Sequence, residues 1–411
     1  MDDITTAVAA LGPGPLQDAS LRRCVDPLFS RVLGTNPGTI YLANHSLGRP
    51  LDRMQADLER YTAAWYDNLG GAWEEWLAEV GAFRANVGAL INAPEPGCIV
   101  PKTSAGQGLR AVLNCFDRPI RVLTTRSEFD SIDFLLKSFA GRGRVKLQWI
   151  APHANRLYRE EDVIDGLGQK PDLVVFSLVF YDTGQWLQDA GAIVHAARGQ
   201  GACVLVDLYH AAGALPVDVQ SLDVDFAIGG SYKYLRGGPG AAWLYAHPRR
   251  LATMRTLDTG WFARPEPFNF TRAEEARVAA GGDGWLESTP AIAPFYQARA
   301  GLEFTRAIGV ERLRAHSLAL CARLQDLLAA NGVETLHPGA PRGAFLAIRT
   351  PQAGDCARRL EEVGVVCDAR GDIFRVCPDV LTKPQEIDDA ARLISLALSA
   401  GSIWRGPLRT T

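Results

Sequence analysis

The stretch Gly229-Gly230-Ser231-Tyr232-Lys233-Tyr234-Leu235-Arg236-Gly237-Gly238-Pro239-Gly240 places one lysine in a glycine-rich turn. The run before it, Asp225-Phe226-Ala227-Ile228, is typical of a buried strand. A second apolar run upstream, Ala202-Cys203-Val204-Leu205-Val206-Asp207, ends in a carboxylate. Ligands of open α/β sheets gather at the carboxyl ends of the strands, so we expect Asp207 and Lys233 to share a site.

A buried carboxylate at the end of one strand and a lysine after the next strand suit pyridoxal phosphate (PLP). The lysine amine forms a Schiff base with the aldehyde of this cofactor, and the carboxylate keeps the pyridine nitrogen protonated, so that the ring accepts electrons. The alternatives are that Lys233 is a solvated turn residue and that Asp207 caps a helix. Their pairing after two successive apolar runs favours the cofactor.

Strands alternate with helices through the middle of the chain. Further strands are predicted at 121–125, 145–150 and 172–179, with a crossover helix at 188–199. This alternation predicts an α/β fold whose sheet is mostly parallel and covered on both faces. Phe129 and Phe180 follow predicted strand ends, as Asp207 and Lys233 do, and are expected to join the same site.

The ends of the chain differ from its middle. Residues 1–38 are rich in Gly, Pro and small residues, which predicts a loose arm with one short helix. A continuous helical pattern from Phe295 to about Ala330 precedes a second mixture of strands and helices. We therefore expect an N-terminal arm near the active site (1–50), a large PLP-binding domain (51–295) and a small C-terminal α+β domain (296–411).

An aromatic cluster precedes the sheet region. Its members share a helical stripe or follow it closely: Leu51, Met54, Leu58, Tyr61, Trp65, Trp73 and Trp76. The spacing predicts a helix with one apolar face. Aromatic core, packing between subunits and a wall for an aromatic substrate all remain open.

Composition excludes several classes of function. The chain has 411 residues and a net charge of −3, which favours neither nucleic acid nor an anionic membrane as a partner. No apolar run approaches the length of a membrane span, and the N-terminus lacks the pattern of a secretory signal, so a cytoplasmic location is expected. The eight cysteines form no Cys-x-x-Cys pair and the seven histidines show no metal-binding spacing, so reduced thiols and no metal are expected.

A small-residue turn, Pro101-Lys102-Thr103-Ser104-Ala105-Gly106-Gln107-Gly108, precedes a helical pattern. Backbone N–H groups at the start of a helix can bind phosphate, which makes Ser104, Ala105 and Gly106 candidates. The turn lacks the Gly-Lys-Ser/Thr ending of a nucleotide P-loop. A plain helix N-cap is the alternative.

Several segments together carry a family resemblance. The chain resembles the fold-type I PLP enzymes of the class V aminotransferase superfamily and, within it, kynureninase, from Tyr41 to Pro378. The matching segments are Asp207-Leu208-Tyr209-His210-Ala211-Ala212-Gly213, Tyr181-Asp182-Thr183-Gly184-Gln185, Ser231-Tyr232-Lys233-Tyr234-Leu235, Gly260-Trp261-Phe262, Cys367-Asp368-Ala369-Arg370 and Phe374-Arg375-Val376-Cys377-Pro378.

The resemblance implies roles around the cofactor ring. Lys233 would carry the Schiff base and later move protons, and Asp207 would pair with the pyridinium nitrogen. His210 would lie near the ring and the carboxylate, and Phe129 would stack on the ring. Tyr232 would contact the phosphate and serve as a proton donor.

The resemblance also implies a homodimer with shared sites. Trp261 would approach the phosphate from the partner subunit, and Thr289 would help to form the neighbour's cofactor and substrate-ring site. Arg375 would hold the substrate α-carboxylate by a bidentate contact. The turn at His45 and Ser46 would lie on the substrate side, although His45 could equally cap a turn.

The implied reaction is hydrolysis of the Cβ–Cγ bond of kynurenine, or of a ring-modified kynurenine, to an anthranilate and alanine. Departures from the family pattern are His45, Phe180 and Thr289 in place of Asn, Gln and Asn, and the residues at 103–108 in place of a Leu-Thr-x-Asn turn. Phe180 and Thr289 motivate another class V reaction, such as transamination, epimerisation or β-lyase chemistry. A non-catalytic PLP-fold protein is the third alternative, and the intact Lys233 argues against it.

Overall fold

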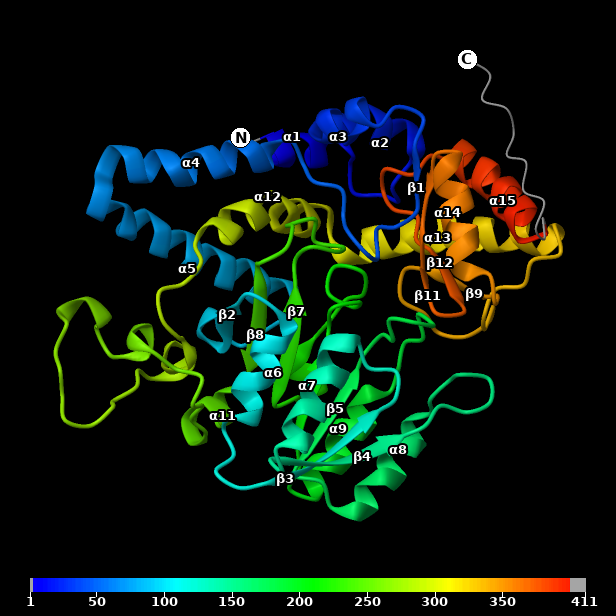
Figure 1. The fold of residues 1–411 in the computed structure, drawn as a ribbon. Coiled ribbons are helices and arrows are strands. Elements are labelled where there is room, and N and C mark those ends of the chain that lie inside the picture. Colours follow the sequence, from blue (N-terminus) through cyan, green and yellow to red (C-terminus); the bar gives the residue numbers. More distant parts are fainter. Residues whose placement is uncertain (1–2, 400–411) are drawn as a thin grey trace.

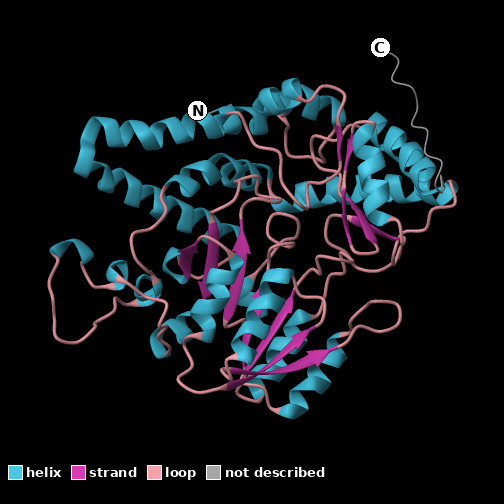
Figure 2. Ribbon diagram, in the orientation of Figure 1, coloured by secondary structure: helices cyan, strands magenta, loops and turns pink. Residues whose placement is uncertain are grey.

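The computed structural model describes residues 3–399. Within this range a seven-stranded sheet forms the centre of the fold, in the order β2-β8-β7-β6-β5-β3-β4 (Figures 1 and 2). Its strands are β2 (Ile99–Lys102), β3 (Ile120–Thr125), β4 (Val145–Ile150), β5 (Leu173–Ser177), β6 (Cys203–Asp207), β7 (Phe226–Gly230) and β8 (Ala242–Ala246). All pairs from β7 to β4 are parallel, and β8 is antiparallel to both its neighbours. The prediction of a mostly parallel sheet is confirmed.

The inner strands are apolar because helices surround the sheet (Figure 2). Every residue of β5, β6 and β7 is buried, as expected of strands covered on both faces. The helices that contact sheet strands include α6 (Ala105–Leu113), α7 (Asp130–Gly141), α8 (Glu160–Gly166) and α9 (Ala190–Gly199). Strand β2 contains Pro101, which the sequence analysis assigned to a turn. A proline fits there because β2 is an edge strand.

Strand register brings the predicted site residues to one edge of the sheet. Asp207, the last residue of β6, is paired with Ser177 at the end of β5 and with Ile228 in β7. Lys233 follows β7 after a short turn. The carboxylate and the lysine therefore lie at the same carboxyl edge.

The C-terminal part forms a smaller unit with its own apolar core. Its sheet has the order β11-β12-β9, and both pairs are antiparallel. The elements are α13 (Val310–Ala330), β9 (Leu346–Arg349), α14 (Ala353–Glu362), β10 (Val365–Val366), β11 (Asp368–Arg370), β12 (Ile373–Val376) and α15 (Pro384–Ser399). The predicted boundaries at 50/51 and 295/296 stay predictions, and residues 1–2 and 400–411 lie outside the described part.

The helical pattern predicted across 295–330 is divided between two helices. Helix α12 (Ala293–Ile308) ends at Gly309, and α13 begins immediately after it. Gly309 has a φ of 91°, a conformation that side-chain-bearing residues rarely adopt. A single glycine inside a helical pattern is compatible with a continuous helix, so the break is not visible in the periodicity.

The prediction of a loose N-terminal arm is also wrong. Residues 3–35 form α1 (Asp3–Ala10), α2 (Asp18–Cys24) and α3 (Ser30–Thr35), which pack on α12 (Figure 1). Phe29, in the short 3-10 helix Asp26–Phe29 between α2 and α3, meets Phe304 edge-on with ring centroids 5.3 Å apart. These helices are too short to show a clear period, and tertiary contacts stabilise them.

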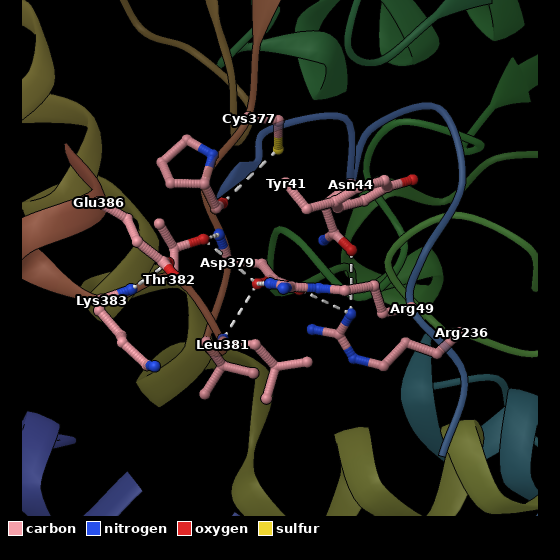
Figure 3. A network of polar contacts seen from close by, with 12 residues as sticks. Tyr41, Asn44, Arg49, Arg236, Cys377, Asp379, Leu381, Thr382, Lys383 and Glu386 are labelled. Atoms are coloured by element: carbon pink, nitrogen blue, oxygen red, sulfur yellow. Dashed lines mark hydrogen bonds and ion pairs between the residues drawn. The ribbon is translucent and has the colours of Figure 1, made fainter. Parts of the chain in front are cut away.

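The segment after these helices is joined to the C-terminal unit. Strand β1 (Ile40–Tyr41) pairs in parallel with β10, and Ala43 forms a bridge with Cys377. Figure 3 shows a buried network beside this junction. Asp379 accepts hydrogen bonds from Arg49 and from Nη1 of Arg236, the latter at 3.0 Å. The network connects the N-terminal segment, the loop after Lys233 and the C-terminal unit.

Helices α4 (Arg53–Asn68) and α5 (Ala72–Leu90) form an antiparallel hairpin that protrudes from the molecule (Figure 1). The last residue of the predicted apolar stripe is not buried within the chain, because Trp65 is 56 % exposed. No helix within residues 3–399 combines the length and apolarity that a membrane span requires. All eight cysteines are free thiols, as expected.

Candidate active site

A cavity of about 250 Å³ opens at the carboxyl edge of β5, β6 and β7. Seven of the predicted site residues line it: Ser104, Ala105, Phe129, Asp207, His210, Tyr232 and Lys233. The structure therefore brings together residues from four separate segments of the chain, among them Phe129, Asp207 and Lys233, which were predicted to meet because they follow strand ends. Their chemical roles stay predictions.

Lys233 is the lysine that lines this cavity. It is 5 % exposed, and its Nζ lies 2.6 Å from Nε2 of His210. The same Nζ lies 5.3 Å from the ring centroids of Phe129 and Tyr209 and 5.6 Å from that of Tyr232. Burial lowers the pKa of Lys233, which favours the unprotonated amine. Only the unprotonated amine attacks an aldehyde.

Asp207 is the matching carboxylate. It is 5 % exposed, and its Oδ1 accepts a hydrogen bond of 2.7 Å from the N–H of Tyr209. Burial raises the pKa of Asp207, while the Tyr209 hydrogen bond and Lys233 oppose that effect. A buried carboxylate is costly without a cationic partner, so the site fits a protonated pyridine nitrogen.

His210 is neutral. Burial, followed by the charges of Lys233 and Arg375, places the pKa of His210 well below its usual value. Its Nδ1 is buried without a hydrogen-bond partner among the described residues. A polar cofactor atom would satisfy such a group, so His210 fits its predicted place near the ring.

The phosphate candidates lie at the start of α6. Ser104 is the N-cap of this helix, and its Oγ accepts a hydrogen bond of 3.2 Å from the N–H of Gln107. The hydroxyl still has its own O–H to donate, so helix capping and phosphate binding are compatible. Gly106 does not line the cavity, and a Cβ there would lie 3.0 Å from Leu135.

Arg375 lies just outside the residues that line the cavity. Its Nε donates to Oδ1 of Asp368 at 2.8 Å and its Nη2 to Oδ2 at 2.5 Å, while Nη1 donates to the carbonyl of Tyr181. A guanidinium has five N–H groups, and these contacts use three of them. One N–H is left on Nη1 and one on Nη2, which matches the two oxygens of a substrate carboxylate.

The turn at 44–48 packs against the backbone of Tyr232 and Lys233. The N–H of Gly48 donates to the carbonyl of Tyr232 at 2.8 Å, and a Cβ on Gly48 would come within 2.0 Å of the Lys233 carbonyl oxygen. Neither His45 nor Ser46 lines the cavity. His45 is completely buried, and Ser46 is half-buried in the turn, with its N–H donating to Ala43.

Trp261 and Thr289 are not brought to this cavity within one chain. The indole N–H of Trp261 donates to Oγ1 of Thr289 at 3.1 Å. Thr289 lines a second, larger cavity of about 550 Å³, which shares Thr103 with the first. Their predicted role requires the site of a second subunit.

Sequence reasoning missed several residues that line the cavity: Thr103, Ser131, Ser177, Val179, Tyr181, Tyr209, Pro239 and Gly240. Tyr209 was detectable, because it stands between Asp207 and His210 in the quoted segment. A Cβ on Gly230 would lie 2.0 Å from the Tyr209 hydroxyl, so a glycine is needed at this strand position. Phe180 does not line the cavity and instead stacks on Tyr158 at 4.6 Å.

Glu128 is a further buried acid that the sequence did not single out. Its carboxylate accepts hydrogen bonds from Oγ1 of Thr125 at 2.7 Å and from Oγ of Ser177 at 2.6 Å. Burial raises the pKa of Glu128 to about 8 against these hydrogen bonds. No group of three or more metal-binding side chains that could hold an ion occurs within residues 3–399.

Comparisons with known proteins identify the family of the chain. The model of the family "Aminotransferase class-V" matches residues 47–392. The chain is 33% identical to the kynureninase of Salinispora tropica over 373 residues, which cover 82% of this chain and 85% of that protein. It is 31% identical to the kynureninase of Koribacter versatilis, covering 83% and 86%. An uncharacterized aminotransferase of Bacillus subtilis, YcbU, is 27% identical, covering 84% and 90%.

Solved structures share the fold. The cystine C–S lyase C-DES in complex with cysteine persulfide has a TM-score of 0.79 at 19% identity, covering 88% of this chain and 99% of that one. A second C-DES structure, with glycine covalently linked to PLP, has a TM-score of 0.77 at 20% identity, covering 90% and 98%. The predicted fold-type I architecture is thereby confirmed. The chain belongs to the aminotransferase class-V family, and it is an enzyme whose cofactor is PLP.

Proposed function

We propose that this enzyme hydrolyses the Cβ–Cγ bond of kynurenine, or of a ring-modified kynurenine, to an anthranilate and alanine. The observation that carries the proposal is the alignment with two kynureninases at 31% and 33% identity over more than four-fifths of the chain. The site supports it, because Arg375 has two N–H groups left for an α-carboxylate near Lys233.

The residues divide the work as follows. PLP, when bound, supplies the electron sink for the bonds that break at the amino acid. Lys233, whose pKa burial lowers to about 7, takes the proton from the substrate Cα in its unprotonated form. His210 holds that amine by the 2.6 Å contact, and Arg375 orients the α-carboxylate. One water is consumed at the γ-carbonyl, so that kynurenine and water balance anthranilate and alanine.

The direct test is incubation of the purified holoenzyme with kynurenine and with 3-hydroxykynurenine. We expect fluorescence of the anthranilate product and one equivalent of alanine. The Lys233→Ala variant, assayed beside it, should form neither. If the holoenzyme changes the cofactor absorbance with kynurenine but forms no anthranilate from any ring variant, this proposal is wrong.

A second candidate is another class V reaction, namely transamination, epimerisation or β-lyase chemistry. It is favoured by the 27% identity to YcbU, which carries the name of an aminotransferase, and by the departures at His45 and Thr289. A keto acid or the opposite enantiomer, formed from a panel of amino acids, would replace the kynureninase proposal with this one.

We also propose that two copies of the chain pair and share their sites. A row of contacting aromatic rings, exposed at Trp65 and Phe268, runs from the α4–α5 hairpin to the loop at 261–270. Consecutive ring contacts of 5.3 to 5.8 Å link Trp65, Trp76, Trp73, Phe268 and Trp261. So large an aromatic surface favours burial against a partner. Sedimentation of the wild type and of the Trp65→Asp variant tests this: a dimer that becomes a monomer is expected. A cytoplasmic location stays a prediction.

A further inference from the structure

His45 is a buried imidazole next to the site, and it does not line the cavity. Its ring stacks on Phe345, with centroids 4.9 Å apart and an angle of 27° between the planes. Its Nε2 lies 2.9 Å from Oδ1 of Asp368. Because the side chain is 0 % exposed, His45 acts on a ligand through a neighbouring group. The only hydrogen bond that its ring makes within residues 3–399 leads to Asp368.

The protonation of this pair follows from its surroundings. Burial lowers the pKa of His45 to about 4, so the imidazole is neutral at ordinary pH. Burial alone would raise the pKa of Asp368, but hydrogen bonds from His45 and Arg375 outweigh it and keep that pKa well below its usual value. An ionised carboxylate only accepts hydrogen bonds, so Nε2 of His45 carries the proton and donates it.

Asp368 is the link between the imidazole and the guanidinium. Asp368 and Arg375 are cross-strand partners in β11 and β12, and the carboxylate binds the Nε and Nη2 edge of the arginine. The terminal torsion of an aspartate side chain has a broad energy minimum. Two hydrogen bonds to Arg375 alone therefore hold the Asp368 carboxylate less firmly than three hydrogen bonds to two groups do. Nη2 of Arg370 lies 3.8 Å from Oδ2, beyond hydrogen-bond distance, so His45 adds the third hydrogen bond to this carboxylate, on Oδ1 and from a separate segment of the chain.

We propose that His45 is a positioning residue for the substrate α-carboxylate. It holds Asp368 flat against one edge of Arg375 and thereby fixes the direction of the two unused N–H groups on Nη1 and Nη2. The inference rests on the proposed role of Arg375. The direction matters because Nη1 also donates to the carbonyl of Tyr181, a residue that lines the cavity. A guanidinium that turned away from Asp368 would lose this alignment.

Side-chain reach provides matched variants. The amide nitrogen of glutamine extends about as far from Cα as Nε2 of histidine, whereas the asparagine amide ends at the level of Nδ1. His45→Gln therefore retains a donor to Asp368, and His45→Asn and His45→Leu do not. Both amides are polar and uncharged, so the Gln and Asn variants differ mainly in reach.

The test compares two ligands that differ only in the carboxylate: kynurenine and its decarboxylated amine, kynuramine. Binding to the holoenzyme is read from the change in cofactor absorbance, which requires no turnover. We expect His45→Asn and His45→Leu to weaken kynurenine binding by about ten-fold or more, as for loss of a hydrogen bond to a charged group. Kynuramine binding should be unchanged, and His45→Gln should restore kynurenine binding. PLP content and the urea midpoint of each variant serve as controls.

Two results would overturn the inference. The first is equal weakening of both ligands, or of neither, in His45→Asn, which would make His45 a packing residue or an irrelevant one. The second is a wild type that does not prefer kynurenine over kynuramine, which would remove the role of Arg375. Failure of the proposed reaction is distinguishable, because it appears as absent anthranilate while the ligand preference and its dependence on position 45 persist. If His45→Leu does not fold, the Asn and Gln variants decide.

Discussion

Replacement of Asp379 by asparagine tests the buried charge network of Figure 3. In the wild type, Oδ1 accepts from Arg49 and from the N–H of Leu381 at 3.0 Å, and Oδ2 accepts from Arg236 at 3.0 Å. The variant Asp379→Asn keeps the size and one acceptor. One of the two arginines then faces the amide N–H₂ group, and the other faces a neutral carbonyl oxygen, which is a weaker acceptor. Both buried guanidinium groups, those of Arg49 and Arg236, lose their counter-charge.

The magnitude follows from the geometry. One ion pair at 3.0 Å in an effective dielectric of about 20 has a Coulomb energy of about 5 kcal/mol before solvation is counted. Removal of one partner of a buried pair costs about 3–5 kcal/mol of folding free energy, because the remaining charge stays desolvated. That loss is a large part of the total stability of a typical protein.

The assay is urea unfolding of wild type and Asp379→Asn, followed by circular dichroism at several pH values. Burial would raise the pKa of Asp379, but Arg49 and Arg236 outweigh it and lower it from 3.8. The stability from the ionised carboxylate is therefore present above pH 3.8 and lost as the pH falls further below that value. The difference between wild type and variant should be full at pH 7 and shrink in strong acid.

A matched control is Asp388→Asn. Asp388 also binds an arginine in two-pronged geometry, to Arg323 at 2.9 and 2.8 Å, but on the surface. Solvent screens such a pair, so no measurable change is expected. Equal losses for Asp379→Asn and Asp388→Asn, or a loss below about 1 kcal/mol at position 379, would refute the reasoning from burial.

Three further outcomes are expected. Burial raises the pKa of Glu128 to about 8, so the protonated side chain stabilises the fold at acid pH, and this stabilisation is lost as the pH rises toward 8. In urea titrations, Glu128→Gln should therefore show a smaller decline of unfolding free energy with pH than the wild type does. Gly309→Ala should lower the unfolding free energy by about 1–3 kcal/mol, because φ there is 91°, and an unchanged urea midpoint would contradict this. Gly230→Ala should weaken PLP binding in dialysis, because its Cβ displaces Tyr209 from the cavity wall; unchanged affinity would show that Tyr209 moves without cost.

The centre of the site was predictable because it depends on residues that directly follow two strands. Asp207 and Lys233 each follow an apolar run, and parallel strands bring such positions together. The same rule failed for Phe180, which follows β5 closely but packs on Tyr158. The position of a residue after a strand end indicates the edge of the sheet, whereas the direction of its side chain depends on the loop.

Features that depend on distant segments were not predictable. The N-terminal helices are short and pack on α12, whereas the Gly, Pro and small residues of 1–38 indicated a loose arm. Asp368 was quoted within a motif, but its contact with His45 joins residues from opposite parts of the chain. The proposed place of Trp261 beside a second subunit stays a prediction, because it depends on a partner that one sequence does not describe.

The parallel pairing of β1 with β10 imposes an order on biosynthesis. During translation, residues 40–43 are synthesised early, whereas their strand partners at 365–377 are synthesised near the end. Residues 40–43 therefore stay unpaired for most of translation. The central sheet needs only residues 99–246 and can form first. The turn with Gly48, whose N–H donates to the carbonyl of Tyr232, therefore reaches its place only after the sheet has formed, and β1 gains its strand partner last.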